Sequence, residues 1–268
     1  MSSGYDPDFL GLPVALPASS TPADQLARLD YRHFTVVLHR RRRLAELTSV
    51  NIDGDNLVDV GRGDDWHLDE RVPADEQAGP ELYARNDLDR GHLVRRRDPV
   101  WGPDADEANY DTFSYANAAP QVNSFNQSKE LWLGLEDYLL DHADATGRRL
   151  TVLTGPVFDD ADPKYRGIQL PRKFFKVAVW VMDDAAAATA YLLDQGALLD
   201  RLTLPAAWAV DDPPELGPFR TFQLAVSEVS RLTGLDLAQL EAVDRFAPRP
   251  GLLRSDWTLL ESAADIRL

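Results

Sequence analysis

Predicted β-strands dominate this chain and limit the folds open to it. From His33 to Leu38 the apolar residues Phe34, Val36 and Leu38 recur at every second position, which predicts a strand with one buried face. Further strands are predicted at 44–52, 111–115, 150–154, 174–182 and 189–193. Helical spacing is found in two segments, 124–142 and 222–232. Strands outnumber helices without a regular alternation between them, which predicts a mixed α+β domain.

The remaining segments predict loops around one domain. Residues 1–30 are rich in Pro, Ala and Ser and predict an extended N-terminal arm lying over a domain of residues 31–268. Polar, Gly- and Pro-containing stretches predict loops at 61–86 and 205–218 and a turn at 117–120. No stretch approaches the roughly 20 apolar residues of a membrane span, so no membrane partner is expected. The first ten residues show no secretory signal, so a cytoplasmic location is the default expectation.

Charge and cysteine content narrow the chemistry. The net charge is -16, which argues against a nucleic-acid partner, but the basic residues are 24 arginines and four lysines, with arginine clusters at 40–43 and 95–97. A local basic cleft can still hold phosphate, because salt screens distant charges beyond about 10 Å. The 40–43 cluster is either the solvated tip of a hairpin or a phosphate contact. With no cysteine in the chain, a metal must bind oxygen or imidazole, which favours magnesium or manganese.

The densest group of chemically useful side chains lies between residues 86 and 101. It contains the run Asp89-Arg90-Gly91-His92, followed by Arg95, Arg96 and Arg97. An imidazole with a pKa near 6.5 can deprotonate water, while guanidinium groups neutralise phosphate oxygens. The alternative interpretation of the run alone is a histidine hydrogen-bonded to its neighbouring aspartate on a loop.

A second group of residues favours the catalytic interpretation. It consists of Ala116-Asn117-Ala118-Ala119-Pro120-Gln121, then Asn126-Gln127, then Trp132-Leu133-Gly134-Leu135-Glu136. Together with Asp89-Arg90-Gly91-His92, this series closely resembles the DNA/RNA non-specific endonucleases, the endonuclease G-like nucleases with a His-Me finger. The similarity extends over about residues 30–245. The resemblance implies a single mixed domain with a central antiparallel sheet flanked by helices and a ββα-metal active-site motif.

The resemblance also implies roles for individual residues. His92 would be the general base, Asn126 the one direct protein ligand of Mg²⁺ (with Mn²⁺ as an alternative), and Glu136 the holder of a metal-bound water. Magnesium tends to keep its waters, so such sparse ligation is physically reasonable. Asn117 would shape the site near the histidine, and Asp89 would support it from outside the metal's ligand set. The segment from Asn126 to Trp132 is two residues longer than in the best-known members, so either the insertion precedes the regular helix or Glu136 faces away from the metal.

Arginines would bind the substrate. Arg90 is expected on the attacked phosphate, and Arg95 and Arg96 on its neighbours. An upstream arginine acts on the transition state in the family, and spacing does not choose between Arg62 and Arg71.

The implied activity is metal-dependent, sequence-non-specific hydrolysis of DNA and RNA, single- or double-stranded, to products with a 5′ phosphate. Two alternatives remain at this stage, a silent nuclease-like binding module and a phosphodiesterase for small nucleotides. A second copy of the chain and a protein inhibitor are further partners compatible with this interpretation.

Overall fold

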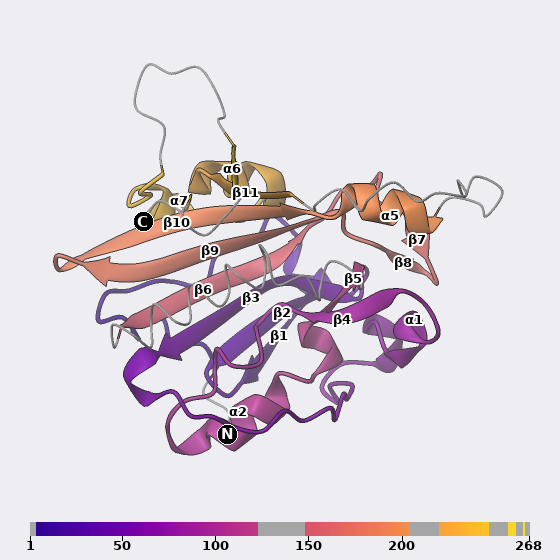
Figure 1. The fold of residues 1–268 in the computed structure, drawn as a ribbon, viewed down its shortest axis with the longest axis horizontal. Coiled ribbons are helices and arrows are strands. Elements are labelled where there is room, and N and C mark those ends of the chain that lie inside the picture. Colours follow the sequence, from indigo (N-terminus) through magenta and orange to yellow (C-terminus); the bar gives the residue numbers. More distant parts are fainter. Residues whose placement is uncertain (1–3, 123–147, 204–219, 247–256, 261–264, 266–268) are drawn as a thin grey trace.

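An eight-stranded antiparallel sheet runs through the molecule (Figure 1). The computed structural model describes residues 4–122, 148–203, 220–246, 257–260 and 265. The strand order is β1-β2-β3-β6-β9-β10-β11-β12, and each neighbouring pair is antiparallel. This arrangement confirms the predicted mixed α+β class with a large antiparallel sheet.

The elements have the following bounds. The strands are β1 Leu26–Tyr31, β2 Phe34–His39, β3 Leu44–Asp53, β4 Leu88–His92, β5 Ala118–Val122, β6 Arg149–Val157, β7 Lys164–Tyr165, β8 Ile168–Gln169, β9 Lys173–Met182, β10 Ala185–Asp194, β11 Arg220–Leu224 and β12 Thr258–Leu260. The α-helices are α1 Pro80–Tyr83, α2 Ala105–Asp111, α5 Gly196–Thr203, α6 Val226–Thr233 and α7 Ala238–Glu241. Short 3-10 turns are η1 Ala23–Gln25, η2 Gly54–Asn56, η3 Ala74–Glu76, η4 Gly102–Asp104 and η5 Tyr115–Asn117. Within these ranges no helix is long and apolar enough to cross a membrane.

Most of the predicted strands are present, and three local predictions were wrong. The strand expected at 111–115 is the end of α2 followed by a turn, because the backbone of Thr112, Phe113 and Ser114 is hydrogen-bonded within the preceding turn. The turn expected at 117–120 instead passes into β5. The start of the helix expected at 222–232 is β11, whose Phe222 pairs with Leu192 of β10.

Residues 4–22 contain none of the named helices and strands. Tyr5 and Val14 are buried against the sheet, and the side chain of Asn51 accepts a hydrogen bond from Asp6. The last part of the predicted arm differs, because Leu26–Tyr31 forms β1 at the edge of the sheet by pairing with β2. The predicted helix 124–142 and loop 205–218 lie outside the described residues.

The sheet separates two apolar cores. One core includes Val229 and Leu240, where α6 and α7 pack on the sheet, and the other includes Leu88 and Ala119 of the short ribbon β4–β5 (Figure 1). Burial of these apolar side chains is what holds the two outer layers on the sheet. The ribbon is therefore fixed on one face of a rigid support.

A buried glutamine adds polar contacts between the ribbon and the end of β10. The Gln195 side chain accepts a hydrogen bond from Val122 N (3.1 Å) and donates to the carbonyl oxygens of Pro120 (3.2 Å) and Pro171 (2.7 Å). These bonds satisfy the Gln195 amide inside the protein and fix β5 against the body of the domain.

Candidate active site

Strand β4 carries the sequence Asp89-Arg90-Gly91-His92 that the sequence analysis singled out. It pairs with β5, so that Gly91 lies opposite Ala119 and His92 opposite Ala118. A Cβ atom at position 91 would overlap the side chain of Gln121, which is buried. Glycine at position 91 therefore leaves the space that the buried Gln121 side chain occupies.

The His92 ring lies among aromatic side chains. Its centroid is 4.8 Å from that of Trp66 and 5.3 Å from that of Phe113. The Nε2 atom is buried and has no hydrogen-bond partner among the described residues. An imidazolium N–H left unpaired in such surroundings would be costly, which favours the neutral ring.

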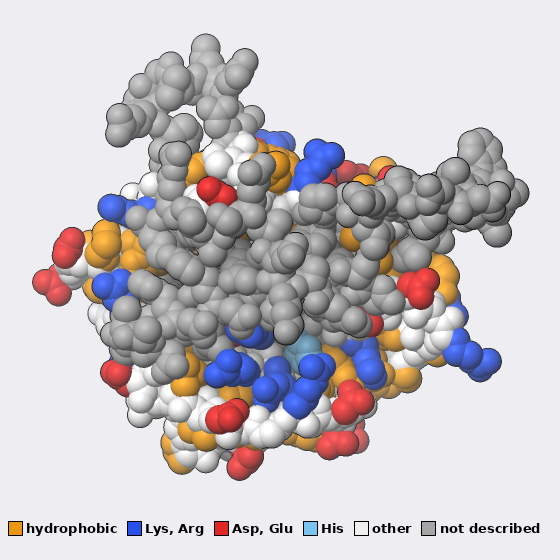
Figure 2. Space-filling view, viewed as in Figure 1, with side chains coloured by type: hydrophobic (Ala, Val, Ile, Leu, Met, Phe, Trp, Pro, Cys, Tyr) orange, Lys and Arg blue, Asp and Glu red, His pale blue; other side chains and the backbone are white. Residues whose placement is uncertain are grey.

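Nearby cations act in the same direction. Burial, followed by the positive charges of Arg62, Arg96 and Arg90, lowers the pKa of His92 to about 3. The imidazole is consequently uncharged at neutral pH and able to accept a proton. Figure 2 shows basic side chains gathered beside a histidine on one face of the molecule, although the net charge is -16. Positive charge is concentrated locally, as a phosphate-binding cleft requires.

Asn117 holds the backbone that follows His92. Its side-chain oxygen accepts from Val94 N (2.9 Å), and its amide donates to Val94 O (2.9 Å) and Thr112 O (3.0 Å). Its own carbonyl accepts from Leu93 N at 2.9 Å. These contacts tie the end of β4 to the start of β5. Asn117 thus supports the position of His92 through the backbone.

Trp66 links the histidine to Arg90. The guanidinium of Arg90 lies 4.9 Å from the Trp66 ring centroid, and the guanidinium also forms an ion pair of 3.8 Å with Asp64. The loop that carries Trp66 is held in place by two backbone bonds, His67 N to Phe113 O and Tyr115 N to His67 O. Trp66 therefore contacts both His92 and Arg90 from a loop that these backbone bonds hold.

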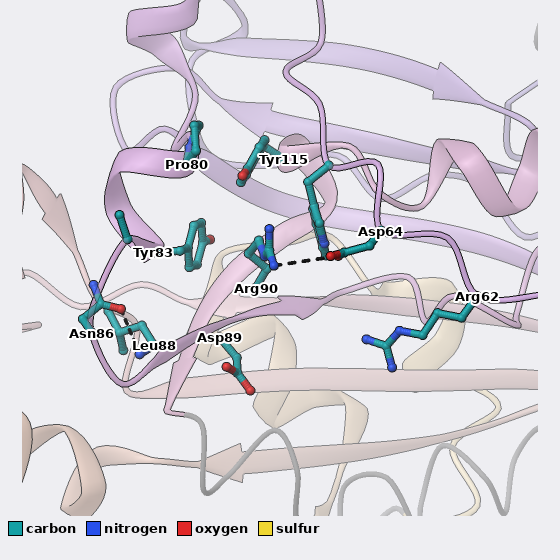
Figure 3. A pocket seen from close by; sticks show the side chains of 11 residues that line it. Arg62, Asp64, Pro80, Tyr83, Asn86, Leu88, Asp89, Arg90 and Tyr115 are labelled. Carbon is teal, nitrogen blue, oxygen red and sulfur yellow. Dashed lines mark hydrogen bonds and ion pairs between the residues drawn. The ribbon is translucent and has the colours of Figure 1, made fainter.

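A cavity of about 460 Å³ lies beside β4. It is lined by Arg62, Asp64, Trp66, Pro80, Tyr83, Ala84, Asn86, Leu88, Asp89, Arg90 and Tyr115. Figure 3 shows Arg62 towards one end, Arg90 and Asp64 between, and Tyr83 and Asn86 at the other end. Asp89 and Arg90, neighbours on β4, both reach this cavity.

The two candidate upstream arginines differ in their contacts. Arg71 forms an ion pair with Asp69 (2.6 Å), donates to Asp30 O (2.8 Å) and lies over the ring of Tyr31. Arg62 is exposed, lines the cavity and acts electrostatically on His92. The structure brings Arg62 to the site, whereas Arg71 serves a neighbouring ion pair.

The arginines that follow β4 also form contacts within the protein. Arg96 donates to Val60 O (2.8 Å) and to Asn109 Oδ1 (3.1 Å), yet lies close enough to His92 to influence its pKa. Arg95 is half-buried directly after the strand. Three arginines of the 40–43 cluster form ion pairs with carboxylates: Arg40 with Glu76, Arg42 with Asp160 and Arg43 with Glu81. These ion pairs connect the turn to other segments of the chain.

Comparison with known proteins identifies the family of this site. Residues 15–244 match the profile of the DNA/RNA non-specific endonucleases. The chain belongs to this family. The resemblance carried by the residues around His92 is thereby confirmed across most of the chain.

Individual relatives agree with the family. The uncharacterized protein y4fB of Sinorhizobium fredii is 38% identical over 258 residues, covering 88% of this chain and 39% of that protein. Mitochondrial endonuclease G of Bos taurus is 33% identical over 127 residues, covering 43% of this chain and 40% of that protein. This chain thus spans about two fifths of the length of these relatives.

A solved structure shares the fold. The crystal structure of the EndoG/EndoGI complex, concerned with EndoG inhibition, matches 80% of this chain and 86% of that chain, with a TM-score of 0.59 and 20% identity. At this identity the likeness establishes the architecture, which is that of EndoG.

A divalent metal is expected in this endonuclease family. Asn126 and Glu136 fall in 123–147, outside the described residues. In the described part of the chain, no three His, Asp or Glu side chains are grouped to hold a metal ion. The described side of the site offers an imidazole and the carboxylates of Asp64 and Asp89, a donor chemistry that fits a hard cation with few protein ligands. Asn117 is not a candidate ligand, because the backbone occupies its side chain.

The candidate site also contains residues that sequence reasoning missed. Trp66, Asp64 and Phe113 lie around His92 and Arg90 of β4, and Tyr83 lines the cavity. A sequence signal existed for Trp66 and Tyr83, since each is a large aromatic residue inside the polar segment 61–86, which was predicted to be a loop.

Proposed function

We propose that this chain is a metal-dependent, sequence-non-specific endonuclease that hydrolyses phosphodiester bonds in DNA and RNA. The observation that carries the proposal is the neutral His92 imidazole, whose neighbours Arg62, Arg90 and Arg96 supply positive charge. A neutral base among cations suits an anionic substrate whose hydrolysis requires removal of a proton from water. Family membership supports the same class of reaction.

The proposed step uses the histidine as general base. Water attacks phosphorus while His92 accepts its proton, and the bond from phosphorus to the 3′ oxygen breaks. The leaving oxygen takes a proton from solvent, so the products carry a 5′ phosphate and a 3′ hydroxyl. With a pKa near 3, the free imidazole accepts a proton reluctantly. A phosphodiester bound by Arg62 and Arg90 brings negative charge, which offsets the arginines and raises the pKa of His92 towards the working pH. Substrate binding thus makes the base effective.

Asn126 and Glu136 are the proposed holders of the divalent ion, Mg²⁺ or Mn²⁺. When bound, this ion would polarise the phosphate and stabilise the leaving oxygen. Asp89 is proposed as support beside these residues, and Asn117 as the residue that positions the backbone after His92.

Arginines are proposed to bind the substrate through its phosphates. Arg62 and Arg90 face the cavity and contact the attacked phosphate, while Arg95 and Arg96 extend the cradle. The known neighbour EndoG forms a complex with EndoGI, so we include a protein inhibitor among the proposed partners, together with a second copy of this chain.

Activity on different substrates tests the proposal. We expect the protein to nick plasmid DNA and degrade long RNA in the presence of Mg²⁺, to cut dinucleotides poorly, and to be inactive with a chelator. Gel analysis and chromatography of products provide the measurement. Rapid cleavage of dinucleotides alone would favour a small-nucleotide phosphodiesterase, and binding without any cleavage would indicate a silent module.

The pH dependence tests the electrostatic argument. A lowered pKa means that His92 stays neutral, and the rate that depends on it is retained, until the pH falls through the folded-state pKa. The acid limb of kcat/KM should therefore lie below pH 6.5. Arg62→Gln removes a cation, so we expect the His92 pKa to rise by about one unit and the acid limb to move to higher pH.

An NMR titration of the His92 ring measures the same shift without substrate. The matched control is Arg231→Gln, which makes the same charge change at an exposed arginine of α6, in the opposite layer. Equal His92 titrations in the wild type and Arg62→Gln would contradict the proposed role of Arg62.

A further inference from the structure

The cavity beside β4 has two chemically different ends (Figure 3). Arg62 and Arg90 supply positive charge, whereas Tyr83, Tyr115 and Pro80 supply aromatic and apolar surface. A volume of about 460 Å³ lies within the range of pockets that hold small organic ligands. The cavity is therefore large enough for one nucleotide in addition to the attacked phosphate.

One polar group at the aromatic end, the Tyr83 hydroxyl, forms no hydrogen bond within the described part of the chain. This hydroxyl is buried. Burial is the main cause that raises the pKa of Tyr83, so the hydroxyl keeps its proton and can donate. A buried donor without a partner is unfavourable, and a ligand acceptor would relieve this cost.

The other polar group at this end is already bonded. Asn86 donates to Leu82 O (2.6 Å) and Tyr165 Oη (3.3 Å), and its oxygen accepts from Leu88 N (3.1 Å). Asn86 builds the wall of the cavity and has little capacity left to distinguish one base from another. This arrangement suits a ligand that binds without recognition of its hydrogen-bond pattern.

The charges decide between a base and a second phosphate as the occupant of the aromatic end. Asp64 and Asp89 also line the cavity, and their carboxylates repel an additional phosphate. A nucleobase is uncharged, stacks on aromatic rings whatever its identity, and accepts hydrogen bonds at its edge. A nucleobase can therefore both stack on the aromatic rings and accept a hydrogen bond from the Tyr83 hydroxyl.

We propose that this cavity binds the base of an unstacked nucleotide adjoining the scissile phosphate, with Tyr83 donating a hydrogen bond to that base. The inference rests on the proposed nuclease function. Bases in a duplex are held inside the stack, so reaching the cavity requires unpairing and unstacking. Single-stranded DNA and RNA are consequently the preferred substrates, and each base type is accepted.

The test uses labelled single-stranded oligonucleotides with one abasic site at a defined position. We expect the wild type to cut one of the linkages flanking the abasic site about tenfold more slowly than the same linkage in the intact strand, because stacking is lost. Tyr83→Phe should lower kcat/KM on the intact strand about fivefold, while causing no further loss at the abasic-flanked linkage. The melting temperature of Tyr83→Phe should equal or exceed that of the wild type, since the hydroxyl has no hydrogen-bond partner among the described residues.

The control is Tyr110→Phe, which removes a hydroxyl from an exposed tyrosine of α2 stacked on His67, away from the cavity. Tyr110→Phe should leave the ratio between the cleavage rates of the intact linkage and the abasic-flanked linkage unchanged from the wild type. Equal cleavage of intact and abasic linkages by the wild type would overturn the inference while leaving the nuclease function standing.

If no substrate is cut, the proposed function fails and the cavity is judged by binding alone. Calorimetry with a nucleoside monophosphate and a chelator should then show weaker binding by Tyr83→Phe than by Tyr110→Phe. Equal binding by the two variants would contradict the proposal.

Discussion

His92→Ala should lower the cleavage rate by about 10² to 10⁴, the usual cost of losing a general base. His67 does not replace it, because that ring stacks on Tyr110 with centroids 4.4 Å apart. The measurement is kcat and kcat/KM on plasmid DNA at saturating Mg²⁺. The fold should survive, since the side chain that is removed carries a buried nitrogen without a hydrogen bond among the described residues.

His67→Ala is the matched control for this prediction. It removes a histidine ring close in sequence to Trp66 but separate from the cavity lining, and it should retain near wild-type activity. Thermal unfolding of both variants shows whether each is folded. A folded His92→Ala protein that cuts at wild-type speed would exclude the histidine as the base.

Asn117→Ala should reduce both stability and activity. It leaves Val94 N, Val94 O and Thr112 O without their partners in a buried region. At about 1–3 kcal/mol for each unsatisfied group, with partial relaxation, we expect a loss of about 3 kcal/mol in the free energy of unfolding. Because the same contacts position the end of β4, kcat should fall by about 10² even where the variant is folded.

A substitution at a second buried amide distinguishes a loss of positioning at the site from a loss of stability. Gln223→Ala in β11 removes a side chain that donates to Thr189 Oγ1, in a strand distant in sequence from the ribbon. It should lower stability while leaving kcat close to wild type at a temperature where it is folded. A similar fall in kcat for Gln223→Ala and Asn117→Ala would show that the effect is general destabilisation. In that case the positioning role of Asn117 would be rejected.

Local patterns in the sequence were sufficient to predict much of the sheet and the residues at the centre of the candidate site. Alternating apolar residues predicted β2 closely, and the strands predicted at 44–52 and 174–182 match β3 and β9. All three strands bury most of their side chains between the two cores, which explains why apolar residues mark them in the sequence. The run Asp89 to His92 pointed to a phosphodiester site because its chemistry is carried by side chains adjacent in sequence. Family resemblance extended the interpretation over about residues 30–245, and the family match over residues 15–244 confirmed that the chain belongs to the DNA/RNA non-specific endonucleases.

Contacts between distant segments decided the rest. Phe222 lies in a strand rather than a helix because β10 offers it a partner, a fact that no local pattern contains. Arg62 and Arg71 are equivalent in sequence, but Asp69 and Tyr31 bind Arg71, whereas Arg62 remains beside the cavity. Trp66 meets His92 only because backbone bonds attach its loop to the segment before β5. Sequence determines the chemistry that each residue can perform, whereas the pairing of charges, the burial of the imidazole and the shape of the cavity depend on residues that only folding brings together.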